Sequence, residues 1–328
     1  MIRLGTVGTS AICAHFLDGA ALTKRFVHTA VCSRSEKTGA DFAKKDGCEN
    51  IFTNPLDMAK SGKIDAVYIA TPNVFHKEQS RIFLENGVHV LCEKPIVTKL
   101  SDYLELKELA DRKGLIYMEA IIPRHVKHYS AVKSAISEIG QIQMARIDFC
   151  QRSSRLENLL NGEQVNIFDM SLHAGALMDI GVYCVYGALD LLGEPLSVTA
   201  KSFPLYNGAD GAGSVILDYG SFPAMLTYSK TCEGILGSEI IGTDGAVKIQ
   251  KISQYAGVIL LKDGKETSVV AFPSKAELMS GEAERFAEYI ENFGSNAEDY
   301  KNASALCEKV HFFMDSIKNN AGLYYPDK

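Results

Sequence analysis

The sequence predicts an α/β protein: an N-terminal doubly wound parallel sheet, followed by an α+β domain with a large, mainly antiparallel sheet. Over the first third of the chain, strand-like and helix-like stretches alternate, and such alternation is typical of βαβ units. After Glu119 the alternation gives way to short strands separated by glycine-rich turns. A chain of 328 residues suits two domains. We therefore expect a first domain over residues 1–119 and a second over 120–328.

In the first domain, continuous apolar runs predict strands that are buried on both faces of a sheet. These runs cover residues 2–7, 27–32, 65–70, 88–92 and 115–118. The stretches between them repeat apolar residues at helical spacing, which predicts helices over 11–22, 35–45 and 74–86. A further helix is expected to begin at a Ser101 cap and to end near Gly114.

In the second domain, several short stretches have the character of strands, and two turns are typical of hairpins. The turns are Thr243-Asp244-Gly245 and Lys262-Asp263-Gly264. Expected strands cover residues 142–150, 214–218, 224–229, 238–242, 246–249 and 258–261. Expected helices cover 129–139, 175–192, 282–293 and 303–318. This pattern predicts an antiparallel sheet with helices packed on it.

The composition indicates a globular protein of the cytoplasm. Hydrophobic residues make up 46% and charged residues 23% of the chain, and the net charge of -6 with scattered lysines and arginines argues against a nucleic-acid partner. None of the eight cysteines forms a CxxC pair, which favours reduced core residues over a disulfide framework. The sequence opens on a strand-like run, so we expect neither a signal peptide nor a membrane span.

A glycine loop follows the first predicted strand: Gly5-Thr6-Val7-Gly8-Thr9-Ser10-Ala11-Ile12. A strand that turns into a helix through glycines is the context of a dinucleotide-binding Rossmann fingerprint. The match is incomplete, because Ser10 and Cys13 replace the second and third glycines. A plain tight turn is the alternative. We expect Gly8, Thr9, Ser10, Ala11 and Ile12 to contact a dinucleotide, whose pyrophosphate the start of the helix favours.

The end of the second predicted strand indicates which dinucleotide binds. An acidic residue there would bind the ribose 2′-hydroxyl, whereas an arginine can pair with a 2′-phosphate. The chain has Cys32-Ser33-Arg34, and the first carboxylate is that of Glu36. We expect Ser33 and Arg34 to bind NADP in preference to NAD. A solvated arginine at a strand end is the alternative.

Three further stretches carry a family resemblance. They are Ala70-Thr71-Pro72-Asn73-Val74-Phe75-His76, Gly87-Val88-His89-Val90-Leu91-Cys92-Glu93-Lys94-Pro95 and Asp179-Ile180-Gly181-Val182-Tyr183. Together they resemble the glucose–fructose oxidoreductase, inositol dehydrogenase and rhizopine-catabolism (Gfo/Idh/MocA) family, over nearly the whole chain. Met118-Glu119-Ala120 with Arg124 is similar to the family's entry into its second domain. The third stretch resembles the branch of dimeric dihydrodiol dehydrogenase.

The resemblance implies an NAD(P)-dependent oxidoreductase with an acid/base set of Lys94, Asp179 and Tyr183. It also implies a cis peptide bond before Pro95. Further cofactor contacts are expected from the matching stretches, namely Thr71, Pro72, Asn73, His76, Glu93 and Lys94. Packing or capping would explain His76 equally well.

These residue types suit alcohol oxidation, in which a hydride and a proton leave the substrate. A lysine at the carboxyl end of a parallel strand can stabilise a developing alkoxide. Asp179 and Tyr183 lie four residues apart on a predicted helix, so both would project from one face. The sequence leaves open whether Lys94 or Tyr183 is the final proton carrier.

We therefore expect an NADP-preferring enzyme that acts on CH–OH groups of a sugar, polyol or related small molecule, and that forms a homo-oligomer. The alternative is a nucleotide-dependent sensor of the same fold that catalyses no reaction. His125 and His128 are three residues apart but have no cluster of cysteine or carboxylate ligands beside them. Since metal sites need three or four ligands, we expect no metal.

Overall fold

The computed structural model describes residues 1–326, which form two compact units. The first unit contains Met1–His125 and Ser274–Ala305. The second contains Val126–Pro273 and the described residues from Leu306 onwards. The chain therefore leaves the first unit after residue 125 and returns to it with one further segment, 274–305.

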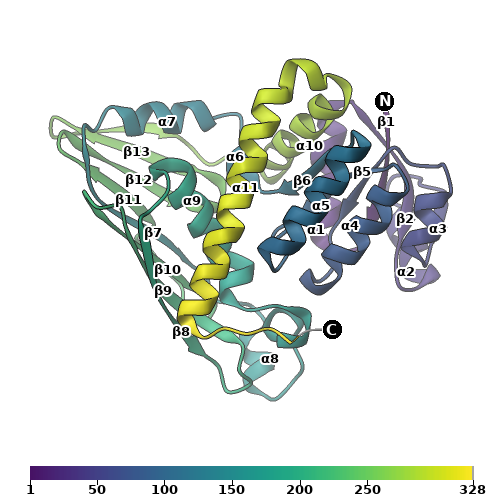
Figure 1. The fold of residues 1–328 in the computed structure, drawn as a ribbon, viewed down its shortest axis with the longest axis horizontal. Coiled ribbons are helices and arrows are strands. Elements are labelled where there is room, and N and C mark those ends of the chain that lie inside the picture. The colour runs from purple at the N-terminus through teal and green to yellow at the C-terminus, as the bar shows by residue number, and fades with distance from the viewer. Residues whose placement is uncertain (327–328) are drawn as a thin grey trace. The chain divides into compact units, whose positions relative to one another are not determined.

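The first unit is built on a six-stranded parallel sheet with the order β3-β2-β1-β4-β5-β6 (Figure 1). This is the order of a dinucleotide-binding Rossmann sheet, and it confirms the predicted doubly wound fold. One strand, β3, was absent from the sequence-based expectations. The strands are β1 Ile2–Val7, β2 Phe26–Cys32, β3 Asn50–Phe52, β4 Ala66–Ile69, β5 His89–Glu93 and β6 Tyr117–Ala120.

The helices of the first unit follow the predicted alternation, with corrections at their ends. Ser101 does not cap a helix, because α5 begins at Leu100 and its N-cap is Lys99. The predicted helix 282–293 begins earlier, at a capping box formed by Ser274 and Glu277. The helices are α1 Ala11–Thr23, α2 Glu36–Ala43, α3 Pro55–Lys60, η1 Asn73–Phe75, α4 His76–Glu85, α5 Leu100–Lys113, α6 Ile122–His125, α10 Lys275–Glu291 and the start of α11 Phe293–Ala321.

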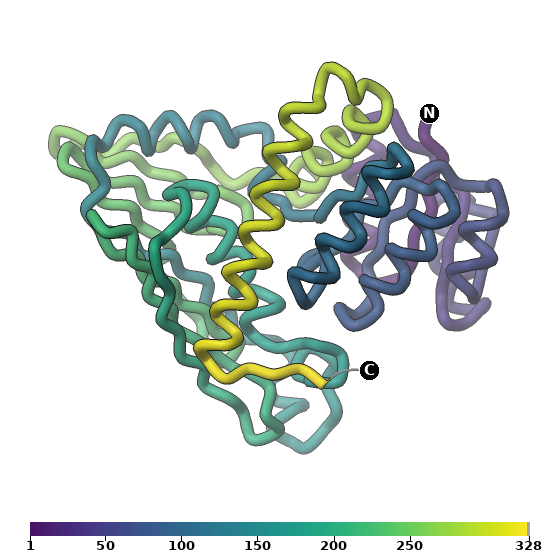
Figure 2. Tube along the Cα trace, viewed as in Figure 1, coloured from purple at the N-terminus to yellow at the C-terminus, as the bar shows by residue number. Residues whose placement is uncertain are grey.

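Helices from opposite ends of the sequence share the core of the first unit. Figure 2 shows α10, in yellow-green, beside α1 in purple. The two backbones approach closely at Gly19, where an added Cβ would lie 2.5 Å from the Cβ of Met279. From α1, Phe16 stacks on Tyr68 of β4 with 3.9 Å between ring centroids. This contact fixes the first helix against the middle of the sheet.

The second unit is built on an eight-stranded sheet with the order β14-β13-β12-β11-β7-β10-β9-β8. All neighbouring pairs are antiparallel except β7 and β10, which confirms the predicted, mainly antiparallel sheet. Asp263 and Gly264 both have positive φ, as a tight hairpin turn requires. The strands are β7 Ile142–Cys150, β8 Ser197–Pro204, β9 Asp210–Asp218, β10 Pro223–Ser229, β11 Ser238–Gly242, β12 Gly245–Lys251, β13 Ala256–Lys262 and β14 Lys265–Val270.

Helices pack on this sheet, among them α7 and α9 (Figure 1). The predicted helix 175–192 divides into a π-helical turn, η4, and α9. The stretch Met170–Leu192 is long and apolar enough to cross a membrane. However, 78% of its 18-residue apolar segment is buried inside the protein, as in a core helix. The helices are α7 Tyr129–Ser137, α8 Leu156–Leu160, η2 Asn166–Phe168, η3 Met170–Leu172, η4 Leu177–Gly181, α9 Val182–Leu192, η5 Ile252–Gln254 and the remainder of α11.

Candidate active site

The predicted nucleotide residues of the first unit gather at one edge of its sheet. Parallel strands bring their carboxyl ends to the same edge. Backbone hydrogen bonds join the segments there: the Gly8 N–H donates to the Cys32 carbonyl over 2.9 Å, and the Ala70 N–H donates to Val7 over 2.9 Å. Because β1 lies between β2 and β4, the strand order reverses at β1 and β4, which is where doubly wound sheets bind ligands.

The turn after β1 has the geometry of a dinucleotide cradle. Gly8 has a φ of +109°, and an added Cβ would lie 2.5 Å from the Ala70 carbonyl oxygen, so this position requires glycine. The next helix, α1, begins at Ala11 with no side-chain cap on its N-terminus and no acidic residue in its first turn. Its first N–H groups and partial positive charge therefore remain available to a pyrophosphate, and Ser10 is small enough for close approach.

The end of β2 presents Ser33 and Arg34 beside this turn. The Ser33 N–H donates to the Phe52 carbonyl over 3.0 Å, and Ser35 caps α2 by accepting the Thr38 N–H over 3.1 Å. Arg34 is exposed between these two anchored residues. The arrangement leaves a cation at the strand end, where a ribose phosphate would lie.

The turn after β4 is held by His76. One ring nitrogen lies 2.8 Å from the Thr71 carbonyl oxygen and the other 2.9 Å from that of Pro95. Burial lowers the pKa of His76. The Thr71 hydroxyl donates to Gln79 over 2.7 Å, and Pro72 leads into η1 at Asn73. A neutral imidazole has one N–H and donates to one of these carbonyls, and the ring lies between the turn after β4 and the loop that follows β5.

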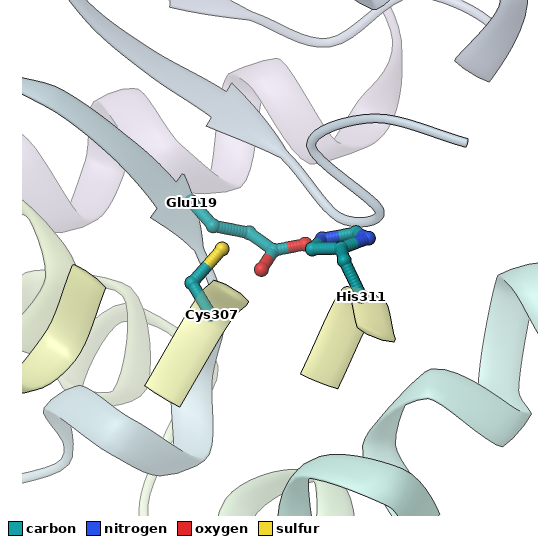
Figure 3. Close-up of side chains that lie close together, drawn as sticks. All are labelled: Glu119, Cys307 and His311. Carbon is teal, nitrogen blue, oxygen red and sulfur yellow. The ribbon is translucent and has the colours of Figure 1, made fainter. Parts of the chain in front are cut away.

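That loop carries Glu93, Lys94 and Pro95 directly at the end of β5. The Lys94–Pro95 peptide bond is cis, as the resemblance implies. Lys94 donates its backbone N–H to the Glu93 carboxylate over 3.2 Å. Glu119, which lies in β6 (Figure 3), accepts the Ile96 N–H over 2.8 Å and so fixes the loop from the next strand. The carboxylates of Glu93 and Glu119 therefore hold the backbone on either side of Pro95.

Two glutamates lie near one another beside Lys94: Glu93, which the sequence analysis named as a cofactor contact, and Glu282, which it did not. The Glu93 carboxylate accepts the hydroxyl hydrogen of Tyr68. Glu282 on α10 is buried, with neither carboxylate oxygen hydrogen-bonded within residues 1–326. Burial raises the pKa of both glutamates, and the nearby Glu93 raises that of Glu282 further. Burial thus favours the protonated form of these carboxyls, whereas the charge of Lys94 opposes the rise in the pKa of Glu93.

In the second unit, η4 and the start of α9 carry the other two predicted acid/base residues. Asp179 lies within the π-helical turn, a feature that often marks functional sites. Tyr183 follows in the first turn of α9, and its ring meets that of Phe149 edge-on at 5.8 Å. Phe149 also lines a cavity of about 240 Å³ together with residues of the 233–237 loop.

The start of η4 is capped by a residue from the sheet. Asp210 accepts the Leu177 N–H over 2.7 Å, and its second carboxylate oxygen has no partner within the described residues. Burial raises the pKa of Asp210 to about 6, although the backbone N–H groups of Leu177 and Ala176 oppose the shift. The helical segment that carries Asp179 is thus held by a carboxylate in an apolar environment.

Lys230, which the sequence analysis did not single out, contacts one of the predicted site residues. Its ammonium donates to the Asp179 carboxylate, and the lysine side chain is only 7% exposed. The sequence pattern of β10 could have indicated that Lys230 is buried. Alternate residues of β10 (Ala224, Leu226 and Tyr228) are buried, and Lys230 continues this register. A lysine on the buried face of a strand predicts a specific partner.

His125 is buried in the first unit, and His128 lies in the second unit beside a backbone carbonyl. Burial lowers the pKa of His125 to about 3, and the neighbouring guanidinium groups of Arg124 and Arg285 lower it further. His128 lies against the backbone carbonyl of Gln254, with 3.0 Å between its Nε2 and the oxygen. His125 therefore stays neutral, and His128 lies beside a backbone carbonyl.

Comparison with known proteins decides the family. Residues 2–121 match the oxidoreductase family with an NAD-binding Rossmann fold, and residues 129–248 match the Gfo/Idh/MocA C-terminal domain. The chain belongs to the Gfo/Idh/MocA family. The resemblance predicted from sequence is confirmed, and with it the prediction of an NAD(P)-dependent oxidoreductase that acts on CH–OH groups. As a member of this family, the chain is an enzyme.

Two curated relatives and one solved structure illustrate the family. The chain is 37% identical to the scyllo-inositol 2-dehydrogenase (NADP⁺) IolU of Bacillus subtilis over 99% of both chains. It is 28% identical to the trans-1,2-dihydrobenzene-1,2-diol dehydrogenase of Xenopus tropicalis over 90% of both chains. A 3-ketoreductase from Actinomadura kijaniata, solved with NADP and TDP-benzene, has a TM-score of 0.82 at 22% identity over 98% of both chains. The last likeness supports the fold.

Proposed function

We propose that this enzyme transfers a hydride reversibly between NADP and a hydroxyl-bearing carbon of a cyclic polyol or sugar. The observation that carries the proposal is the position of Lys94, at the carboxyl end of β5, on the same sheet edge as the Gly8 turn. The chain is 37% identical to a scyllo-inositol 2-dehydrogenase over 99% of its length, and this similarity supports a polyol as the substrate class.

The residues of the first unit fit a bound dinucleotide phosphate. The turn residues Gly8, Thr9, Ser10, Ala11 and Ile12 would hold the pyrophosphate, because only glycine fits the first position and α1 starts uncapped. Ser33 and Arg34 would bind the 2′-phosphate, which supports NADP over NAD. The remaining proposed contacts lie at the ends of β4 and β5: Thr71, Pro72, Asn73, His76, Glu93 and Lys94. When bound, the nicotinamide accepts or donates the hydride.

The chain itself must move the proton and orient the hydroxyl. In this proposal the Lys94 ammonium donates a hydrogen bond to the reacting oxygen and stabilises its negative charge as the alcohol is oxidised. Tyr183 exchanges the proton, and Asp179 accepts hydrogen bonds from substrate hydroxyls. Either Lys94 or Tyr183 releases the proton to solvent.

The test is Lys94→Met, which removes the cation but keeps an unbranched side chain only one atom shorter. Because positioned acid/base groups contribute about 10²- to 10⁴-fold, turnover of scyllo-inositol with NADP⁺ should fall by at least about 10²-fold. NADPH affinity in a fluorescence titration should change by less than about threefold, since backbone N–H groups hold most of the cofactor. Lys99→Met, an exposed lysine of the same loop, is the matched control. Turnover by Lys94→Met at the wild-type rate would refute the proposed mechanism.

We further propose that the enzyme is a cytoplasmic homo-oligomer assembled through the open face of its second sheet. Residues on neighbouring strands form a row across this face: Thr199, Ile216, Met225, Arg146 and Glu239 stand opposite one another in the strand registers. Ile216 is 53% exposed and Met225 40% exposed. Exposed apolar side chains flanked by charges are typical of a protein interface.

Within residues 1–326 the cysteines are free, which supports the proposed location in a reducing compartment, the cytoplasm.

A further inference from the structure

Lys230 is held in place by its backbone on two sides. Its N–H donates to the Gly211 carbonyl over 2.8 Å, and its own carbonyl accepts the Ser153 N–H over 2.9 Å. Gly211 belongs to β9, and Ser153 lies just beyond the end of β7. The two strands that flank β10 therefore fix the lysine where the sheet ends. The side chain is buried and reaches Asp179 of η4.

The side chain of Lys230 is buried at an energetic cost. It is 7% exposed, and its ammonium binds the Asp179 carboxylate, which is 28% exposed. An ammonium removed from water loses several kcal/mol of hydration, and a buried ion pair is often no more stable than well-packed apolar side chains of similar volume. A position that served packing alone would therefore accept methionine. The ion pair indicates that a charge is needed beside Asp179.

The ammonium of Lys230 has donors to spare. A lysine carries three N–H donors. Among residues 1–326, the Asp179 carboxylate is its one hydrogen-bonding partner. Asp179 is the more exposed member of the pair, so the pair faces solvent through the carboxylate. Together the two groups present a hydrogen-bond acceptor and hydrogen-bond donors side by side.

We propose that Lys230 is a positioning and specificity-determining residue of the substrate site. It fixes the Asp179 carboxylate, and with it forms a donor–acceptor pair for two neighbouring hydroxyls of the substrate. A hydroxyl group both donates and accepts, so one hydroxyl of a vicinal diol donates to Asp179 while the next accepts from Lys230. This inference rests on the proposed function and narrows its substrate class to polyols and sugars with adjacent free hydroxyls.

The test is a double-mutant cycle on the holoenzyme, with scyllo-inositol and NADP⁺ as probes. Lys230→Met should raise the KM for scyllo-inositol and lower kcat/KM by about 10- to 100-fold, the loss expected for hydrogen bonds to charged groups. Lys230→Arg, which keeps the charge and the donors, should recover kcat/KM to within about tenfold of wild type. NADPH affinity should stay within about threefold throughout. Lys201→Met, an exposed lysine on β8, is the matched control.

The cycle separates positioning from a structural role. Because Lys230 also acts through Asp179, adding Lys230→Met to Asp179→Asn should lower kcat/KM by clearly less than Lys230→Met does in the wild type, since the effects of interacting residues are not additive. A full additional loss in the double variant would overturn the proposal. Removing both charges also avoids an unpaired buried carboxylate, so the double variant and Lys230→Arg report on the site even if Lys230→Met does not fold.

The remaining outcomes distinguish this inference from the proposed function. Wild-type turnover of scyllo-inositol together with an unchanged KM and kcat in folded Lys230→Met would overturn the role of Lys230 and leave the proposed function standing. If the wild-type enzyme turns over neither scyllo-inositol nor other polyols with NADP⁺, the proposed function itself fails, and the assignment to Lys230 fails with it.

Discussion

Replacing Asp210 by Asn should make the protein more stable at alkaline pH and have a smaller effect at acidic pH. Burial raises the pKa of Asp210 from 3.8 to about 6. A folded state that holds this proton more tightly than the unfolded state is stabilised below about pH 3.8. It loses that stability as the pH rises through about 6. At 1.36 kcal/mol for each pH unit, the loss above pH 7 is about 3 kcal/mol.

This magnitude exceeds what the carboxylate contributes as a helix cap, which is about 1 kcal/mol. Asparagine keeps an oxygen that can accept the Leu177 N–H, now 2.7 Å from Asp210, and it does not ionise. At pH 4.5 most of the folded wild type has a protonated Asp210, which resembles Asn. The stability advantage of Asp210→Asn should therefore grow by about 2 kcal/mol between pH 4.5 and pH 8.

The measurement is urea unfolding followed by far-UV circular dichroism at both pH values. Asp218→Asn is the matched control, because Asp218 also accepts a backbone N–H, that of Gly220 over 2.7 Å, but is exposed. It shows what the same substitution does to stability at an exposed position. An Asp210→Asn variant that is less stable than wild type at pH 8, or equally stabilised at both pH values, would show that the ionised carboxylate is favourable in this environment and would refute the reasoning.

Two further predictions concern the cofactor and the assembly. Arg34→Asp should weaken NADPH binding by about 10- to 100-fold and shift the preference to NADH, because a charge-assisted contact to the 2′-phosphate is replaced by repulsion. Paired fluorescence titrations measure this, and unchanged NADPH affinity would contradict the role of Arg34. Ile216→Arg should reduce the molar mass in light scattering from that of an oligomer to that of a monomer. A wild-type monomer, or an unchanged oligomer in the variant, would contradict assembly through this face.

Local sequence patterns determined most of the first unit and much of its nucleotide site. Apolar runs with glycine stops mark the strands, and the alternation of strands and helices leaves few ways to connect a parallel sheet. Gly8 could be recognised because a strand-to-helix turn needs an unusual backbone conformation at that point. The short strand β3 escaped notice, since three residues are too few to show a period.

The second unit was predicted as a class of fold, but its key contacts were not. The period of the 175–192 stretch indicated a helix and gave no sign of the π-helical turn that carries Asp179. The cap of that turn comes from Asp210, which lies 33 residues further along the chain than Leu177. Such a cap depends on how the sheet folds back, so the residues around Leu177 contain no trace of it.

By itself, the sequence determined the order of strands and helices, the glycine turn and the family motifs, because each of these depends on residues close together in the chain. The tertiary structure decided which distant residues meet. It returned residues 274–305 to the first unit, where Glu282 lies near Glu93, and it paired Lys230 with Asp179 across 51 residues. Burial raises the pKa of both glutamates, and burial arises only when segments far apart in sequence pack together.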